Sequence, residues 1–373
     1  MHLCVLAGPV KSGTTLLASL LDGHPEIASF PLEVKFLTHW YERLKSKNIT
    51  YSELNDFFLK KSKLALMDPK RSGSADIMNS GRIDFSGFDF DQFAVAMEQR
   101  SKDVQNSIHH SDDLFRRYLI DIHVEVARQL GKSTPKVIIS KEGNHGAKHR
   151  RVIGEFFPRV KFLVVVRDPR DVYASFKLIA EKKRKGVKSP TFKDTVTPTS
   201  FLHFNKKKNF SAFQEINREG KEGPYHLVRY EDLVKEVKTE MTKVAHFLGV
   251  AFSDCVTKPT NFGNPWGGNA SSMEAFSGLA SNRSGKWRNE LTMSETRIIE
   301  FFLSDYLVAG GYSHVPRGIS KLKIISDIIR TEYQGVFFPR SLSTFSLRIV
   351  VKSAFIVLIG IYSALSSREM LGR

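Results

Sequence analysis

Residues 8–15, Gly-Pro-Val-Lys-Ser-Gly-Thr-Thr, have the composition of a loop that binds a phosphate-like anion. They lie between a short apolar run, which predicts a buried strand, and a Leu- and Ala-rich segment, which predicts a helix. Backbone N–H groups at such a junction point toward an anion, and the helix dipole adds about half a positive charge. A Walker A loop ends in Gly-Lys-Ser/Thr, whereas here Gly13 precedes Thr14 and the lysine is Lys11. The loop therefore favours a donor shorter than a triphosphate, with Lys11 facing its bridging oxygen.

Arg167 is a second candidate for binding an anion, because it directly follows the apolar run at 160–166. A charged residue at the end of a buried strand is costly unless it leaves the core and binds an anion. The planar guanidinium suits a phosphate, which it can bind through two parallel hydrogen bonds. Ser175, about two helical turns later, reaches the same side. The alternative is a surface ion pair between Arg167 and Asp171.

The elements around these residues alternate between strands and helices. Apolar runs predict strands at residues 2–7, 26–30, 136–140, 160–166 and 225–228, and helical patterns cover 14–22, 169–180 and 231–248. The continuous run at 160–166 is typical of a central parallel strand covered on both faces. We therefore expect a single α/β domain with a P-loop-like central parallel sheet flanked by helices on both faces. Residues 45–130 read as a helical insertion with loops at 68–85.

Composition limits the class of protein. The chain has 373 residues, of which 41% are hydrophobic and 25% charged, so disordered, collagen-like and disulfide-stapled classes are excluded. Its two cysteines, Cys4 and Cys255, provide neither a disulfide framework nor a cysteine-rich zinc site. The net charge of +17 favours a polyanionic ligand, a nucleic acid or an anionic membrane surface. The basic run at 182–188 is either a solvated loop or a lip that attracts anions.

The two ends of the chain bear on its location. The N-terminal segment has no basic region, long apolar stretch or small-residue cleavage site, so we expect a cytoplasmic protein. Residues 349–365 are strongly apolar but include Lys352, and the 13 uncharged residues 353–365 fall short of a bilayer span of about 20. An apolar helical extension, docked on the protein or in peripheral or anchoring contact with a membrane through 345–366, is expected instead.

Five segments in chain order resemble the sulfotransferases that use 3′-phosphoadenosine 5′-phosphosulfate (PAPS). Residues 11–16 look like the 5′-phosphosulfate loop of that family, and residues 166–175 look like its 3′-phosphate motif. Residues 24–33 resemble the segment that carries the catalytic glutamate in the tyrosylprotein and bacterial carbohydrate branches. Residues 229–233 resemble a third family element, and residues 284–288 resemble a late loop that closes over the nucleotide.

The resemblance implies O-sulfation with PAPS as donor and no metal. Glu33 would be the general base, because a carboxylate within hydrogen-bond reach can accept the hydroxyl proton. Glu26 and, as in the cytosolic branch, His39 are alternatives for that role. Lys11 and Lys141 would stabilise charge on the sulfuryl group and the leaving phosphate. The donor would be bound by Lys11, Ser12, Gly13, Thr14, Thr15, Arg167, Ser175, Tyr230 and Lys286.

The sequence departs from the family at residues 142–145, Glu-Gly-Asn-His, where Lys-Thr/Asp-Pro is more usual after the strand. A plain strand-end lysine therefore stays open as the alternative for Lys141. The resemblance covers residues 3–312, apart from a poorly matched 45–130. It predicts a sulfotransferase domain over 1–312 and an extension over 313–373.

The acceptor and the rival classes depend on weaker signals. The glutamate pattern resembles the carbohydrate and tyrosylprotein branches more than the small-phenol branch, and a sugar hydroxyl on a polysaccharide or glycolipid is the first choice. A P-loop small-molecule kinase would instead require ATP and Mg²⁺. A non-enzymatic nucleic-acid- or membrane-binding protein would explain the charge of +17 but not the spacing of the motifs, so no nucleic-acid partner is expected.

Overall fold

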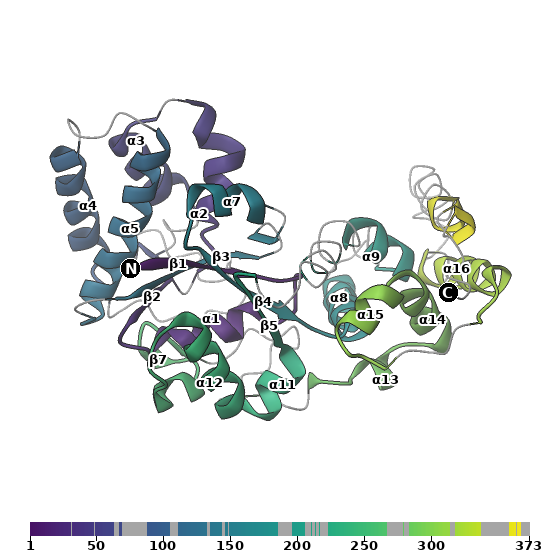
Figure 1. Cartoon of the computed structure of the whole chain (residues 1–373). Helices are drawn as coiled ribbons and strands as arrows, with labels where there is room; N and C mark the ends of the chain where they lie inside the picture. The colour runs from purple at the N-terminus through teal and green to yellow at the C-terminus, as the bar shows by residue number, and fades with distance from the viewer. Residues whose placement is uncertain are drawn as a thin grey trace. The chain divides into compact units, whose positions relative to one another are not determined.

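The computed structural model (Figure 1) describes residues 1–30, 32–47, 49–62, 67–68, 88–104, 111–132, 135–143, 146–147, 149–185, 196–205, 210, 213, 216, 223–266, 279, 283–313, 318–336, 358–362 and 364–366. The chain divides into two compact units. The first unit is formed by residues 1–166 and 219–281, and the second by residues 167–218 and 282–373. The predicted boundary between a domain over 1–312 and an extension over 313–373 stays a prediction.

The first unit is built on a five-stranded sheet in the order β2-β3-β1-β4-β5. The strands are β1 (His2–Ala7), β2 (Ile27–Ser29), β3 (Val137–Gly143), β4 (Lys161–Val166) and β5 (Tyr225–Arg229). Every neighbouring pair is parallel, so all five strands end at one edge, here named the carboxyl edge. The predicted α/β fold with a central parallel sheet is confirmed.

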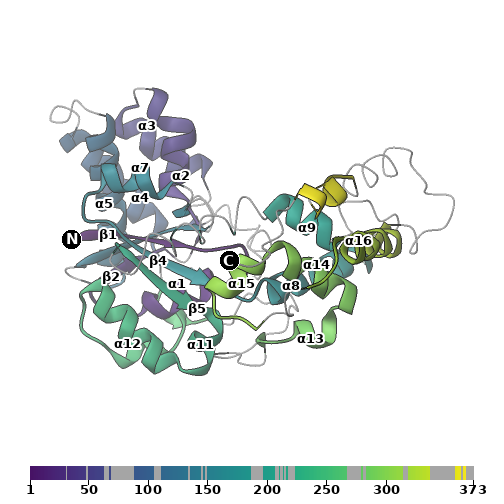
Figure 2. The same cartoon turned by 45° about the vertical axis from the view of Figure 1, so that its right-hand side comes forward.

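Helices cover both faces of this sheet (Figure 1; Figure 2). On one face lie α1 (Thr14–Asp22), α11 (Tyr230–Lys235) and α12 (Val237–Leu248), and on the other lie α5 (Ser111–Gln129) and α7 (Arg150–Phe156). On the first face, Leu17 of α1 and Val244 of α12 pack with Leu163 of β4 in one apolar core. The helix predicted over 231–248 is interrupted at Glu236, whose backbone angles are not helical.

β3 is longer than the apolar pattern predicts. The apolar residues end before Ser140, yet the strand continues through Lys141, Glu142 and Gly143, and all seven of its residues are buried. Buried polar groups are costly unless they form hydrogen bonds. Lys141 donates to the hydroxyl of Thr15, and Glu142 accepts from Thr38, so both polar residues have partners inside the first unit.

The predicted insertion is helical where the structure describes it. It contains α3 (Tyr51–Asn55), a π-helical turn at Asp56–Lys61, α4 (Phe90–Val104) and α5. Just before it lie α2 (Phe36–His39) and a π-helical turn at Trp40–Leu44. The loops predicted at 68–85 lie outside the described residues, apart from Asp68.

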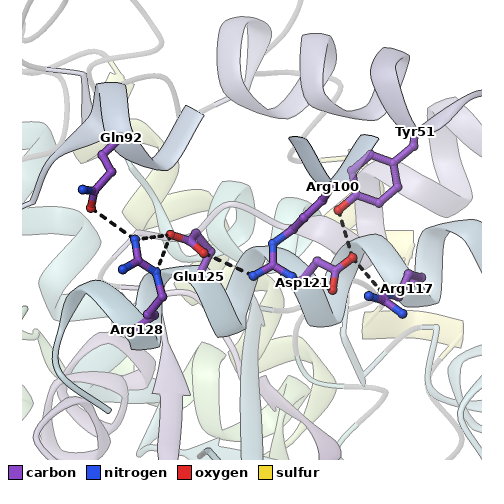
Figure 3. Close-up of polar contacts among 7 residues, drawn as sticks. All are labelled: Tyr51, Gln92, Arg100, Arg117, Asp121, Glu125 and Arg128. Atoms are coloured by element: carbon purple, nitrogen blue, oxygen red, sulfur yellow. Dashed lines mark hydrogen bonds and ion pairs between the residues drawn. The ribbon is translucent and has the colours of Figure 1, made fainter. Parts of the chain in front are cut away.

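A polar network joins the helices of the insertion (Figure 3). Asp121 on α5 accepts hydrogen bonds from the Tyr51 hydroxyl at 3.0 Å and from Arg117 at 2.8 Å. Glu125, one helical turn later, pairs with Arg128 at 2.7 Å and with Arg100 of α4 at 3.2 Å. Both carboxylates are at least 96% buried as side chains, and such groups stay charged in the interior only when cations and donors surround them. The network therefore fixes α3 and α4 against α5.

The second unit is helical in its described part. Its helices are α8 (Pro169–Lys185), α9 (Pro198–Asn205), α13 (Trp287–Glu290), α14 (Met293–Phe302), α15 (Ser304–Ala309) and α16 (Lys321–Val336). The helix predicted over 169–180 continues to Lys185, and the side chains of the basic run at 182–188 lie outside the described residues. Of the apolar segment 349–365, residues 358–362 and 364–365 are described, and they are helical.

No helix in the described parts of the chain is both long enough and apolar enough to cross a membrane.

A buried carboxylate makes the stability of the second unit depend on pH. Glu332 on α16 is 2% exposed, and burial raises its pKa from 4.5 to about 7, an effect that the Thr197 and Thr199 hydroxyls oppose only in part. Between these two values the folded state holds a proton that the unfolded state has lost. Stability therefore falls as pH rises from 4.5 to about 7, by about 3 kcal/mol in total.

Replacing Glu332 with Gln is expected to remove this loss. Urea unfolding of the second unit at about pH 5 and about pH 8 would measure it, and the variant is expected to lose less stability across that range than wild type. Glu290→Gln, which changes an exposed carboxylate of the same unit, is the control. The same loss of stability in wild type and Glu332→Gln would contradict the assignment.

Candidate active site

The loop of residues 8–15, here named the phosphate loop, joins β1 to α1 at the carboxyl edge of the sheet, as predicted. Gly13 precedes α1 with a φ of 105°, and Lys11 has a φ of 66°, a left-handed conformation that is uncommon for a residue with a side chain. Ser12 between them is fully buried, and Thr14 and Thr15 form the first turn of the helix. Backbone strain of this kind is typical of segments that bind a ligand.

Tyr230, the first residue of α11, supports this loop. A Cβ atom at position 13 would lie 2.5 Å from Cδ2 of the Tyr230 ring, which leaves no room for a side chain there. The ring and the backbone angle therefore both require glycine at this position. The Tyr230 side chain is buried at the end of β5. Its predicted contact with the nucleotide stays a prediction, and its observed contact is with the phosphate loop.

Lys141 lies beside the same loop. Its Nζ atom donates a hydrogen bond of 2.7 Å to the Thr15 hydroxyl, and the residue is only 7% exposed. β3 is the immediate neighbour of β1, which brings the end of β3 next to the first turn of α1. A buried ammonium group and the positive end of a helix at one place both favour an anion there. The functional role of Lys141 stays a prediction.

Glu33 also lies at the carboxyl edge, between β2 and α2. Its Oε1 atom pairs with Nζ of Lys35 at 3.2 Å. A Cβ atom on Gly143 would lie 2.9 Å from the same oxygen, and the carbonyl of Gly143 accepts a hydrogen bond of 3.2 Å from the N–H of Gly8. The carboxylate of Glu33, the end of β3 and the phosphate loop are therefore neighbours.

The two alternative bases have different surroundings. Glu26 precedes β2 at the amino edge, where its carbonyl accepts from the backbone of Lys136 and its carboxylate pairs with the Lys136 ammonium. The His39 ring packs edge-on against Phe57 and Phe58, with ring centres 5.2 and 6.2 Å away. Which of the three residues is the base stays a prediction.

Arg167 in the second unit is 8% exposed and is held by its own unit. Its Nη2 atom donates to the carbonyl of Arg283 at 2.8 Å, and its backbone carbonyl accepts from the Tyr306 hydroxyl at 3.2 Å. The hydroxyl of Ser175 donates to the carbonyl of Asp171 at 2.9 Å, within α8. Arg167 and Asp171 are both buried, so the alternative of a pair between them does not lie on the surface.

Asp171 bonds the loop at residues 284–288 to the start of α8. Its carboxylate accepts hydrogen bonds from the N–H groups of Gly285 at 2.7 Å and Trp287 at 2.9 Å. Burial raises the pKa of Asp171, while these two N–H groups and the charge of Arg167 oppose the rise. Two motifs that lie more than a hundred residues apart in the sequence, 166–175 and 284–288, are thus bonded to each other.

The neighbouring Arg170 completes this contact. Its guanidinium stacks 3.9 Å above the Trp287 ring and pairs with Asp168 at 2.7 Å and Glu300 at 2.5 Å. Trp287 therefore packs against Arg170. Lys286 is exposed beside it, and its predicted contact with the nucleotide stays a prediction.

The model of the sulfotransferase family matches residues 5–254. The chain belongs to this family. Three solved structures resemble it: the sulfotransferase domain from the curacin biosynthetic pathway (18% identity, 84% of this chain and 99% of that one, TM-score 0.47), the sulfotransferase domain from the Synechococcus PCC 7002 olefin synthase (17%, 84% and 95%, 0.46) and the sulfotransferase STF9 from Mycobacterium avium (12%, 85% and 78%, 0.42). No curated protein matches the sequence.

Membership of the family makes this chain a sulfotransferase and decides against the kinase and the non-enzymatic binding protein. The predicted family and reaction class are confirmed. Among the described residues, no group of three His, Cys, Asp or Glu side chains could hold a metal ion. His145, the last residue of the segment 142–145 that departs from the family pattern, lies outside the described residues.

Three residues that contact candidate site residues or their motifs could not be found from the sequence. Lys35 has a φ of 58° and pairs with Glu33, but a lysine two residues from a glutamate is no signal by itself. Asp171 bonds to a loop far along the chain, and Glu142 bonds to α2, which lies more than a hundred residues earlier. Only the departure from the family pattern at 142–145 marked Glu142 as unusual.

Proposed function

We propose that this sulfotransferase moves the sulfuryl group of PAPS to a hydroxyl group, with Glu33 as general base. The observation that carries the proposal is the meeting of three features at the carboxyl edge: the Glu33 carboxylate, the buried ammonium of Lys141 and the loop of Lys11. A base and a positively charged anion site side by side are what sulfuryl transfer to an alcohol requires.

Each residue then has a defined part in the reaction. Glu33 accepts the proton of the acceptor hydroxyl while the oxygen of that hydroxyl forms a bond to sulfur. The bond between sulfur and the bridging oxygen breaks, and the electron pair leaves with the 5′-phosphate of adenosine 3′,5′-bisphosphate. Lys11, Lys141 and the N-terminus of α1 stabilise the negative charge that grows on the bridging oxygen. Because these groups are held in place before the reaction, little reorganisation accompanies it.

Arg167 and Ser175 are proposed to bind the 3′-phosphate of the donor. The support is the resemblance of 166–175 to the family motif, together with the bonds that hold this motif to residues 283–287 inside the second unit. ATP has no 3′-phosphate, so these residues would distinguish PAPS from ATP.

Calorimetric binding of adenosine 3′,5′-bisphosphate and of ATP–Mg tests the donor. Wild type is expected to prefer the bisphosphate. Arg167→Ala is expected to weaken bisphosphate binding about 10- to 100-fold, since hydrogen bonds to charged groups contribute about 1.5–3 kcal/mol. Arg330→Ala, which removes an exposed arginine of the same unit, is expected to bind as wild type does. Tight ATP–Mg binding without bisphosphate binding by the folded wild type would contradict PAPS as donor.

The proposed acceptor is a sugar hydroxyl on a polysaccharide or glycolipid. The glutamate pattern at 24–33 and the net charge of +17, which would attract an acceptor that is already anionic, support it. Transfer of labelled sulfate from PAPS to a polysaccharide, a glycolipid, a tyrosine-containing peptide and a simple phenol separates the classes. Exclusive labelling of the peptide or the phenol would contradict the carbohydrate.

Membrane contact through 345–366 is a further part of the proposal. Near the end of this segment, the described helical residues carry three exposed apolar side chains, Leu358, Tyr362 and Leu365. Each is at least 56% exposed, and their spacing puts them on one side of a helix. An exposed apolar stripe of this kind suits the surface of a membrane that contains the proposed glycolipid.

A further inference from the structure

Glu142 is a fully buried carboxylate with four hydrogen bonds. It accepts from the backbone N–H groups of Leu37 and Thr38, both at 3.0 Å, from the Thr38 hydroxyl at 2.8 Å and from the Ser140 hydroxyl at 2.6 Å. Three of these four donors belong to α2, which lies more than a hundred residues earlier in the chain. The carboxylate therefore joins the end of β3 to α2.

This bond replaces a local helix cap. The first N–H groups of a helix have no acceptor inside the helix, and a nearby side chain usually supplies one. The residue before α2 is Lys35, whose side chain makes no capping hydrogen bond and whose φ is 58°. The segment that turns from Glu33 into α2 is thus strained at Lys35 and held from outside by Glu142.

The residues on both sides of Glu142 contact the rest of the site. Lys141 donates to Thr15 in the first turn of α1, and the carbonyl of Gly143 accepts from Gly8 in the phosphate loop. Gly143, with a φ of 57°, also lies against the Glu33 carboxylate, where a Cβ atom would be 2.9 Å from Oε1. Three consecutive residues of β3 therefore connect the phosphate loop to the segment that carries Glu33 and leads into α2.

We propose that Glu142 is a positioning residue that fixes Glu33 relative to the phosphate loop. The inference rests on the proposed role of Glu33 as general base. It also explains the departure at 142–145, because a glutamate side chain reaches the backbone of α2 from the end of β3. A carboxylate suits this place because all four groups that face it are donors, and an anion is favourable at the N-terminus of a helix.

The test is Glu142→Gln, which keeps the size but turns an N–H₂ group toward donors. Hydrogen exchange by mass spectrometry on peptides covering 33–39 is expected to become about tenfold faster or more. With the best acceptor of the labelling panel, kcat is expected to fall about 10- to 100-fold, because a displacement of about 1 Å can cost that much. Binding of adenosine 3′,5′-bisphosphate is expected to stay unchanged.

A double variant separates positioning from general destabilisation. If Glu142 acts through Glu33, adding Glu142→Gln to Glu33→Gln is expected to lower kcat little further. Glu125→Gln is the matched control, since it changes another buried carboxylate of the same unit. It is expected to lower the melting temperature without changing kcat or the exchange of 33–39. Thr38→Val, which removes one of the four bonds, is expected to act like Glu142→Gln but more weakly, should the latter not fold.

Unchanged exchange of 33–39 in Glu142→Gln would overturn the proposal. So would a loss of kcat that is equally large in the Glu33→Gln background. Failure of wild type to bind the bisphosphate would instead overturn the proposed function, and the exchange measurement, which needs no substrate, would still decide whether Glu142 holds the Glu33 segment.

Discussion

Glu33→Gln is expected to lower kcat about 10²- to 10⁴-fold, the usual contribution of a general base. The amide has nearly the size of the carboxylate but cannot accept the proton of the acceptor hydroxyl. Bisphosphate binding is expected to stay close to wild type, because Glu33 lies beside Gly143 and Lys35 and is not one of the residues proposed to bind the donor. Single-turnover transfer from labelled PAPS, measured together with calorimetric binding of the bisphosphate, gives both quantities.

Two variants check this assignment. Glu26→Gln removes the alternative carboxylate at the amino edge and is expected to leave turnover unchanged. His39→Gln tests the alternative base, whose ring packs against Phe57 and Phe58. Near-normal turnover by Glu33→Gln, with a large loss in either of the others, would give the role of base to that residue.

Replacing Lys11 is expected to lower kcat about 10²- to 10³-fold, the usual cost of removing one group that stabilises charge in a transition state. The backbone of Lys11 complicates the experiment, because its φ of 66° is unfavourable for most side chains. Lys11→Asn is the preferred variant, since asparagine tolerates the left-handed region. Lys11→Met keeps about the length of the side chain, but methionine tolerates this backbone conformation no better than lysine does.

Comparison of these two variants separates charge from strain. Equal loss of kcat in Lys11→Asn and Lys11→Met, with a melting temperature that is higher for Asn than for Met, is expected if the lost charge dominates. Full turnover by Lys11→Asn would show that the ammonium does not stabilise the leaving phosphate, and Lys141 would remain as the candidate for that role.

Several elements could be predicted because their signals are local. The apolar run of β1, that of β4 and the glycine before α1 each occupy only a few consecutive residues, and each restricts the backbone there directly. The end of β3 could not be predicted, because Lys141 and Glu142 are polar. They stay in a buried strand since their partners, Thr15 and Thr38, come from other elements.

The sequence by itself determined the kind of anion loop that this sulfotransferase has, because the spacing of Lys11 and Gly13 is a property of one short segment. The sequence left Glu33, Glu26 and His39 as three candidates for the general base. Only the tertiary structure put Glu33 beside the phosphate loop, because the strand order brings the end of β2 next to β3 and β3 next to β1. Glu26 lies a few residues earlier and yet at the opposite edge, since a strand separates the two residues and strand order, unlike spacing, depends on packing between distant segments.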